Sequence, residues 1–396
     1  MVIINGLYLH YTLYQKLLII KFYLKRRIRV LYTIPNFDTA GSGKALLNIA
    51  MGLDKNKFEA HLLCSHSRGA FFEVVKESGI SVHIFDYLSP ARPIYKLFVG
   101  TWKVSHLLKK IQPDIIHSFH YSADYTEALA AKMAGIPWVF TKKNMNWGGA
   151  SKRSWWLRSK LAAGIIIENT DMKKMFYPDR SNVELIPRGV NIKSFVPQNP
   201  NILIRTQMNT LIDERVIICV ANFIPVKGLE VLLQAFELLV SEFPKWKLWL
   251  IGDETNEYGK KIKSWVQEHN LDSKVHFSGK QADVGSYLDH SEIFVLPTLS
   301  QGEGFGVAML EAMANGKIVL GSDVPGIRDQ LKNYPANLFS AGDWRTLAER
   351  LAELMQKPIV YNQTEGENFI QHVQDEFSLE KEILKHENFY QRILSA

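Results

Sequence analysis

The chain has 396 residues, of which 46% are apolar and 22% charged, and its net charge is +7. This length predicts two domains, and the composition is typical of a globular α/β protein rather than a disordered or disulfide-stapled one. The two cysteines, Cys64 and Cys219, lie in apolar runs without metal or redox spacing. They are therefore expected to be buried thiols in a reducing compartment.

The chain begins with an apolar, tyrosine-rich segment, residues 1–24. It lacks the basic start and small-residue cleavage site of a secretory signal. Lys16 and Lys21 interrupt it, so it fits a membrane-spanning helix poorly. Because the basic cluster 25–29 follows directly, residues 1–27 are expected to form an N-terminal extension. This extension is either an interfacial helix on an anionic bilayer or a helix docked on the protein's own surface.

Residues 28–196 alternate short β runs with helical patterns, which predicts a parallel sheet covered by helices. The expected strands are 28–34, 58–64, 81–85, 113–119, 138–142, 164–169 and 183–187, with a helix at 125–135 among those between them.

A glycine-rich stretch, DTAGSGKALL at 38–47, follows the first strand and is similar to a nucleoside-triphosphate loop. That loop needs glycine where the chain has Asp38 and a hydroxyl where it has Ala45, so we reject this reading. A glycine turn at 41–43 and a helix from about Ala45 remain. The turn either presents N–H groups to an anion or only shapes a tight turn.

The alternation restarts after a polar, proline-bearing linker at 195–201. The second domain, 197–376, is expected to contain strands at 215–223, 247–252, 274–279, 292–297 and 317–322, with helices at 229–243, up to about 270 and from about 306. An amphipathic helix closes the chain within 377–396. The fold class is therefore two doubly wound domains, and the cleft between the carboxyl ends of their strands is the expected active site.

The most informative motif is QGEGFGVAMLEAM at 301–313. Seven residues separate Glu303 from Glu311, and a turn at 304–306 opens a helix between them. Glu311 then lies on an apolar helix face, where an unpaired carboxylate needs a hydrogen-bond donor such as a ribose hydroxyl. The N–H groups at the helix start suit a diphosphate.

This stretch resembles the E-x7-E signature of the GT4 family of retaining, nucleotide-sugar-dependent glycosyltransferases with the GT-B fold. Segments similar to the family's also occur at 113–144, 184–195, 220–239, 248–253 and 296–327, so the resemblance extends over 28–394 and is most specific in the second domain. The resemblance implies a first domain that binds the acceptor, a second that binds the donor, and a last helix that crosses back to the first domain.

The resemblance also implies residue roles in the second domain. Glu311 would bind the ribose, and Glu303 the transferred sugar. Lys227 would neutralise the departing diphosphate. The donor phosphates or sugar would contact the backbone of three further residues, Gly304, Phe305 and Gly306.

In the first domain, the resemblance implies that Gly43 approaches the donor phosphates and that a strand-end histidine faces the sugar. His117 and His120 compete for this second role, and His120 is preferred because His117 lies within an apolar run. The donor-binding position that is usually arginine is Asn222 here. Arg188 replaces the family's asparagine and could supply the missing charge.

The implied reaction is front-face displacement with retention, in which the leaving phosphate helps to deprotonate the acceptor hydroxyl. The chain has no Asp-x-Asp motif, so no metal and no cofactor are expected beyond the nucleoside-diphosphate sugar. The expected acceptor is a glycan or a lipid-linked intermediate of surface polysaccharide synthesis. A nucleotide-sugar epimerase and a non-catalytic partner subunit are alternatives on the same fold.

A second basic and aromatic cluster, WGGASKRSWWLRSKL at 147–161, carries Trp155 and Trp156 among lysines and arginines. It suits a membrane interface or a lipid-pyrophosphate acceptor, or else an amphipathic helix whose tryptophans are core. Nothing else in the chain supports nucleic acid as a partner. The expected location is the cytoplasm, including the inner face of the membrane.

Overall fold

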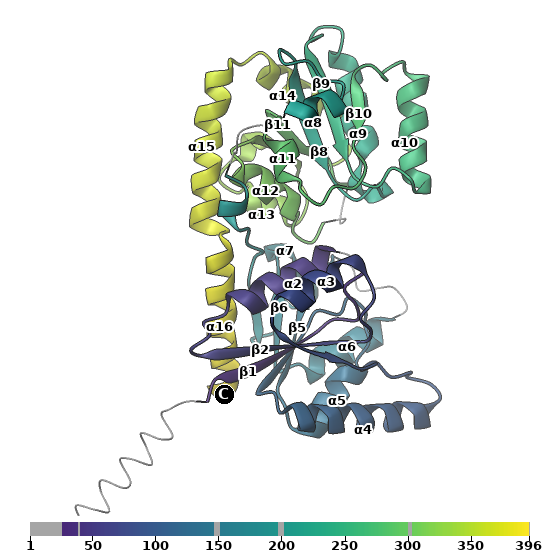
Figure 1. Ribbon diagram of the computed structural model, residues 1–396, viewed down its shortest axis with the longest axis vertical. Helices are drawn as coiled ribbons and strands as arrows, with labels where there is room; N and C mark the ends of the chain where they lie inside the picture. The colour runs from purple at the N-terminus through teal and green to yellow at the C-terminus, as the bar shows by residue number, and fades with distance from the viewer. Residues whose placement is uncertain (1–25, 39, 146–150, 197–201, 300–302, 396) are drawn as a thin grey trace, which may run out of the picture.

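The computed structural model describes residues 26–38, 40–145, 151–196, 202–299 and 303–395. They form two α/β domains, one above the other in Figure 1, each built on a parallel sheet. The predicted fold class is confirmed. Residues 1–25 of the predicted extension and most of the predicted linker lie outside the described residues.

The first domain is a seven-stranded sheet in the order β3-β2-β1-β4-β5-β6-β7. Its strands are β1 Ile28–Thr33, β2 Phe58–Cys64, β3 Ser81–Ile84, β4 Ile115–Ser118, β5 Trp138–Lys142, β6 Gly164–Ile167 and β7 Val183–Leu185. Its helices are α2 Ala40–Gly52, α3 Ala70–Glu77, α4 Ile94–Ile111, α5 Thr126–Ala134, α6 Lys152–Leu161 and α7 Thr170–Phe176.

Both faces of this sheet are covered, which is why its strands read as near-continuous apolar runs. Helices α2 and α3 pack on one face through Leu46, Ile49 and Phe72. Helices α4 to α7 pack on the other face, where Leu108 and Trp155 are among the buried residues. Cys64 is buried in the first of these cores, and Cys219 is buried in the second domain, as expected.

The second domain is a six-stranded parallel sheet in the order β10-β9-β8-β11-β12-β13. Its strands are β8 Arg215–Val220, β9 Trp246–Ile251, β10 Val275–Phe277, β11 Ile293–Leu296, β12 Ile318–Ser322 and β13 Leu338–Phe339. Its helices are α8 Ile202–Gln207, α9 Leu229–Leu239, α10 Glu257–Glu268, α11 Gly285–Leu288, α12 Val307–Ala314, α13 Ile327–Gln330, α14 Trp344–Met355 and α15 Ile359–Glu376.

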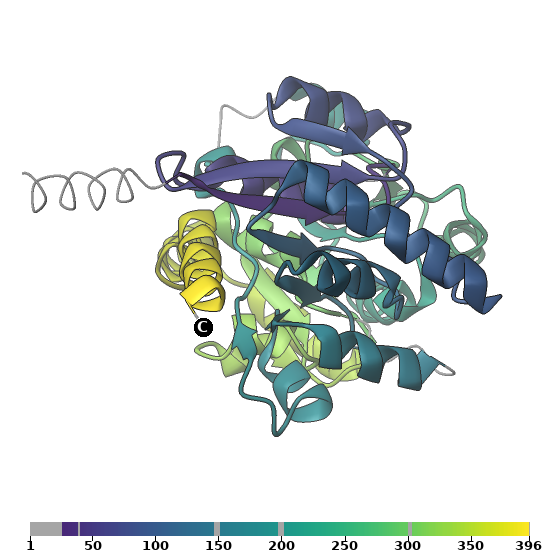
Figure 2. The same cartoon turned by 90° about the horizontal axis from the view of Figure 1, so that it is seen from below.

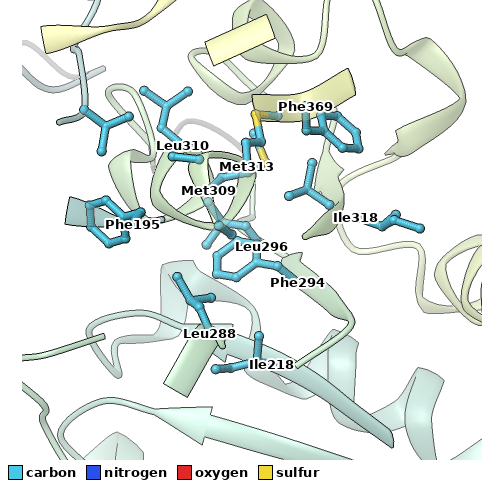
Figure 3. Packing of buried hydrophobic residues seen from close by; sticks show 14 of the residues in the cluster. Phe195, Ile218, Leu288, Phe294, Leu296, Met309, Leu310, Met313, Ile318 and Phe369 are labelled. Atoms are coloured by element: carbon cyan, nitrogen blue, oxygen red, sulfur yellow. The ribbon is translucent and has the colours of Figure 1, made fainter. Parts of the chain in front are cut away.

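Helix α12 is fixed by the apolar core on one side of this sheet. Figure 3 shows Met309, Leu310 and Met313 of α12 among strand residues such as Phe294 and Ile318. Burial of most of its residues leaves α12 little freedom to rotate, so any polar side chain on it keeps a fixed direction. This rigidity matters for Glu311.

The chain crosses between the domains twice, and the two crossing segments are joined by backbone hydrogen bonds. The segment after β7 meets the start of the last helix, α16 (Leu379–Ser395). Val190 N–H donates to the Phe377 carbonyl at 2.9 Å, and Leu379 N–H donates to the Val190 carbonyl at 3.0 Å. Beyond this crossing, α16 packs on the first domain through Phe389 and Tyr390. Figure 1 shows α15 and α16 as a column beside both domains.

The predicted helix start at about Ala45 is wrong, because α2 begins at Ala40. The glycines at 41 and 43 therefore lie in the first helical turn, and the chain turns earlier, within 34–38. The first N–H groups of a helix have no intrahelical partner, so glycine costs little there. The predicted glycine turn at 41–43 is replaced by a helix N-terminus that faces the second domain.

Candidate functional site

A cavity of about 450 Å³ lies between the two domains, at the carboxyl ends of both sheets. The first domain contributes Tyr121, Lys143 and Glu168, which follow β4, β5 and β6. The second contributes Asn222 after β8 and the segment 303–307 between β11 and α12. Parallel sheets expose their strand ends at such a crevice. The interdomain cleft that the sequence predicted is therefore present.

A second cavity, of about 330 Å³, continues from the first into the second domain. Its additional lining includes Val220, Gly252, Lys280 and Gln281, whereas Asn222, Gly306, Glu303 and Glu311 line both cavities. The two cavities are thus parts of one cleft, and the residues of the E-x7-E motif lie where they meet.

Glu311 is held at the cleft by the buried face of α12. Its side chain is 16% exposed, and Lys44 Nζ of α2 lies 3.8 Å from its Oε1. Burial raises the pKa of Glu311, and the charge of Lys44 opposes that rise. The carboxylate that the sequence left without a partner therefore faces a cation of the other domain. Sequence reasoning missed Lys44, although it directly follows the Gly43 that was singled out.

Lys227 and Glu303 are brought together as an ion pair, with side chains 14% and 13% exposed. Lys227 ends a short 3₁₀ turn, Pro225–Lys227, after β8, and Gly228 follows with a φ of 63°. A side chain at Gly228 would overlap the carbonyl oxygen of Pro297. Glycine thus lets the Lys227 turn pack against the end of β11, which places the ammonium group beside the glutamate.

The loop 304–306 presents its backbone to the cleft. The Phe305 ring is buried and lies 5.7 Å from the ring of Phe377, centroid to centroid. The amide of Gln330 donates to the carbonyls of Phe305 and Gly306, and Gly306 caps α12 with a φ of 84°. Because the side chain and carbonyls are bound within the protein, the N–H groups at the start of α12 are the part of this loop left for a ligand.

At Gly304 the backbone of the second domain makes close contact with the first domain. Its carbonyl accepts a 2.6 Å hydrogen bond from the Asn169 amide, and a Cβ at this position would overlap the carbonyl oxygen of Lys143. Backbone contact this close leaves no space for a methyl group.

We expect Gly304→Ala to destabilise the closed arrangement by about 1–3 kcal/mol, because the alanine methyl must displace the Lys143 backbone. The melting temperature of the variant and its donor affinity would measure the effect. Gly41→Ala is the matched control, since a Cβ there meets nothing within 4 Å. Equal melting temperatures for the two variants would contradict the close approach.

The two histidines occupy different environments. His117 is fully buried, with Nδ1 2.6 Å from the Tyr390 hydroxyl and Nε2 2.8 Å from Thr141 Oγ1. Both ring nitrogens are thus used inside the core. His120 is half-buried with Nδ1 3.3 Å from Ser122 Oγ, and burial, reinforced by the charges of Arg158 and Lys143, lowers its pKa to about 3.

Among the described lining residues of the cleft, neither His120 nor Gly43 appears. His120 immediately precedes the lining residue Tyr121. Gly43 faces away from the cleft, since a Cβ there would lie 2.9 Å from the Phe37 ring. Their roles toward sugar and phosphate stay predictions.

Sequence reasoning missed Lys143 and Glu168, two titratable residues that line the cleft. Lys143 Nζ lies 3.7 Å from the centroid of the Tyr121 ring and donates to the Phe119 carbonyl. Burial lowers the pKa of Lys143 to about 7 and raises that of Glu168 to about 7, and their mutual attraction opposes both shifts. The rule that favoured His120, a polar residue directly after a buried strand, would also have found Lys143, whereas Glu168 lies inside the predicted strand 164–169 and follows β6 only in the structure.

The expectation that Arg188 supplies the charge missing at Asn222 stays a prediction. Arg188 lines the cleft, but its guanidinium is paired with Glu382 of α16 at 2.5 Å. Asn222 lies at the junction of the two cavities and carries no charge. Within the second domain, Lys227 is the lysine that forms an ion pair with a glutamate of the E-x7-E motif, Glu303.

Comparisons with known proteins agree with this geometry. The family model "Glycosyltransferase Family 4" matches residues 39–194, and "Glycosyl transferases group 1" matches residues 204–370. An uncharacterized glycosyltransferase of Haemophilus influenzae is 23% identical over 88% of this chain and 96% of its own.

Two further relatives carry more specific descriptions. The UDP-Gal:alpha-D-GlcNAc-diphosphoundecaprenol alpha-1,3-galactosyltransferase of Escherichia coli is 25% identical over 71% of this chain and 76% of its own. The crystal structure of Anabaena HepE, in complex with UDP and glucose, superposes with a TM-score of 0.75 at 18% identity. That superposition covers 93% of this chain and 99% of HepE.

Proposed function

We propose, from the premise that the chain belongs to the GT4-type glycosyltransferases with the GT-B fold, that it transfers a sugar from a nucleoside-diphosphate sugar to an acceptor hydroxyl with retention at the anomeric carbon. The observation that carries this proposal is the convergence of Lys227, Glu303 and Glu311 with the start of α12 in one interdomain cleft.

The donor would lie along the two cavities. In this arrangement the smaller cavity takes the nucleoside, and the carboxylate of Glu311 accepts hydrogen bonds from the ribose hydroxyls. The diphosphate lies at the N-terminus of α12, where N–H groups and the helix dipole favour an anion. HepE, which was solved with UDP and glucose, supports a donor of this class on the same fold.

The transfer itself would depend on position and charge. As the sugar–phosphate bond breaks, negative charge grows on the leaving diphosphate. Lys227 then exchanges its ion pair with Glu303 for a contact with the diphosphate and stabilises this charge. Glu303 then contacts the sugar hydroxyls. The leaving phosphate oxygen takes the proton of the attacking acceptor hydroxyl on the same face of the sugar, which gives retention. We propose that no divalent metal is needed, because Lys227 and the N–H groups meet the diphosphate charge.

The acceptor would enter the larger cavity from the first domain, beside Tyr121, Lys143 and Glu168. The E. coli relative acts, by its description, on a diphosphoundecaprenol-linked sugar. This supports a glycan or lipid-linked intermediate of surface polysaccharide synthesis as the acceptor.

We expect Glu311→Ala to weaken binding of the nucleoside diphosphate by about 10- to 100-fold, because two ribose hydroxyls lose a charged acceptor. Isothermal titration calorimetry would measure the affinity. Lys44→Gln is the control for the ion pair alone, since it leaves the carboxylate in place, and it should change the affinity less than Glu311→Ala. Equal losses in both variants would assign Glu311 to domain contact rather than ribose binding.

The proposed function is tested by thermal stability against a panel of nucleotides and nucleotide sugars in EDTA, followed by turnover with the stabilising sugar. Selective stabilisation by one diphosphate sugar, lost in Glu311→Ala, is the expected result. Donor conversion without any acceptor would indicate an epimerase. No stabilisation by any nucleotide would overturn the proposal in favour of a non-catalytic subunit.

A further inference from the structure

Helix α4 of the first domain carries a second apolar face that the core does not use. Its inner face buries Val104, Leu108 and Ile111. Its first turns also expose Ile94, Tyr95, Phe98, Val99 and Trp102, which are between 50% and 66% accessible. Spacings of one, three and four residues place these five side chains on one side of the helix. An apolar patch of this kind marks an interaction surface.

The charge along α4 has one sign. The 18-residue sequence IYKLFVGTWKVSHLLKKI contains four lysines and no acidic residue. Lys96, Lys103 and Lys110 recur every seven residues, so they form a row along the helix beside the apolar stripe. All three are exposed, and Arg92 precedes the helix. The partner of this surface must therefore combine an apolar interior with negative charge.

The position of α4 leaves this surface accessible. Figure 1 shows α4 at the end of the first domain that is farthest from the second domain, and Figure 2 shows it lengthwise across the view from that end. A further cavity, of about 480 Å³, is lined by Ala91, three residues before α4, and by Tyr121, which also lines the catalytic cleft. The segment before α4 thus lines a hollow that has Tyr121 in common with the cleft.

From these observations we propose that α4 docks the protein on an anionic lipid bilayer. The aromatic side chains would enter the headgroup region while the lysine row meets lipid phosphates, as in interfacial amphipathic helices. Among the described helices none has the length and apolarity to span a membrane, so α4 lies on the surface. A second copy of the chain fits less well, because pairing two α4 helices would bring together two segments that each contain four lysines and no acidic residue.

The α4 surface differs from the two segments that the sequence offered for membrane binding, residues 1–27 and the 147–161 cluster. Of the tryptophans in the 147–161 cluster, Trp147 lies outside the described residues, and Trp155 is buried in the first-domain core together with Arg158. Trp156 is 61% exposed, with Lys160 Nζ 5.1 Å from its ring centroid. Among the described residues of that cluster one tryptophan is exposed, whereas α4 presents five exposed apolar side chains.

Vesicle flotation with the full chain tests the proposal, using phosphatidylglycerol–phosphatidylcholine vesicles and pure phosphatidylcholine vesicles. We expect binding to the anionic vesicles alone. The triple variant Lys96→Gln, Lys103→Gln, Lys110→Gln should bind about 100-fold more weakly, since each lysine contributes about fivefold. The double variant Phe98→Ser, Trp102→Ser should bind at least tenfold more weakly.

Matched controls lie on the second domain. Leu211→Ser with Ile212→Ser changes two apolar side chains that are 66% and 81% exposed. Lys245→Gln with Lys260→Gln and Lys261→Gln removes the same charge as the α4 triple variant. Wild-type binding by both controls, with unchanged melting temperatures for all variants, supports the α4 surface. Flotation needs no glycosyl transfer, so its outcome is independent of the proposed function.

Two results would overturn the proposal. The α4 variants could float like the wild type, which would assign binding to residues 1–25 or another surface. The wild type could instead form a dimer in sedimentation equilibrium that the α4 variants dissociate, with equal vesicle binding. The stripe would then be an interface between copies of this chain.

Discussion

Replacing Lys227 by glutamine is expected to lower kcat by about 100- to 1000-fold, the loss that follows removal of one charge-stabilising donor at a reacting centre. In the proposed transfer the diphosphate gains negative charge only as its bond to the sugar breaks, so the loss should appear in kcat more than in the KM for the donor. The expected effect is large because neither Asn222 nor Arg188 offers a free charge in place of Lys227. Asn222 is neutral, and the guanidinium of Arg188 is paired with Glu382.

The ion pair between Lys227 and Glu303 requires a separate control variant. Lys227→Gln leaves a nearly buried carboxylate without its cation, which could lower stability by itself. The double variant Lys227→Gln, Glu303→Gln removes both charges, so its melting temperature should return toward that of the wild type while kcat stays low. Lys280→Gln, in the same smaller cavity, should leave kcat within a fewfold of the wild-type value. A raised KM with unchanged kcat in Lys227→Gln would instead assign Lys227 to ground-state binding.

The parts of the site that the sequence predicted are those encoded within one short segment. The E-x7-E motif contains its own turn, its helix start and both glutamates within 303–311, so a local pattern was sufficient. The cleft followed from the strand–helix alternation, because parallel sheets place their strand ends at one edge. Lys227 came from family resemblance, and its pairing with Glu303 was not predicted.

The parts that were missed depend on contacts between distant segments. Lys44 meets Glu311 across the cleft, 267 residues along the chain, and no local pattern encodes that approach. The inner face of α2 is set by packing of Gly43 against Phe37, which turns this glycine from the cleft and leaves Ser42 and Lys44 to line it. Periodicity predicts that a helix has two faces but not which neighbour each face meets.

Helix geometry also explains why the adjacent residues Trp155 and Trp156 differ in exposure. Consecutive residues on a helix point about 100° apart, so Trp155 and Trp156 cannot both be core or both be exposed on one narrow face. The structure buries the first and exposes the second. In α4 the exposed apolar residues repeat at helical spacing. From the sequence alone, such a repeat is equally typical of an exposed apolar face and of a face buried in the core. Only the packing of the opposite face of α4 on the sheet distinguishes these two interpretations.

Glu382→Ala is expected to destabilise the protein by about 3–5 kcal/mol, because removal of one partner leaves the buried Arg188 charge unpaired. Glu382 lies in the first turns of α16, and its side chain is 1% exposed. One carboxylate oxygen is 2.5 Å from Arg188 Nη1, and the other accepts from the N–H of Gly189 at 2.8 Å. Glu382 therefore ties α16 to the crossing segment at the point where the chain passes between the domains.

Thermal unfolding measures this effect, with an expected fall in melting temperature of roughly 6 to 20 °C for a domain of this size. Glu376→Ala is the matched control, because its ion pair with Lys332 is 44% and 52% exposed and should contribute less than about 1 kcal/mol. Glu382→Gln keeps an oxygen for Gly189 but not the charge, so it should fall between the two. A Glu382→Ala protein as stable as Glu376→Ala would contradict a structural role for the pair. Arg188 would then be free to meet the donor phosphates, as the sequence first indicated, and Lys227→Gln should lose correspondingly less activity.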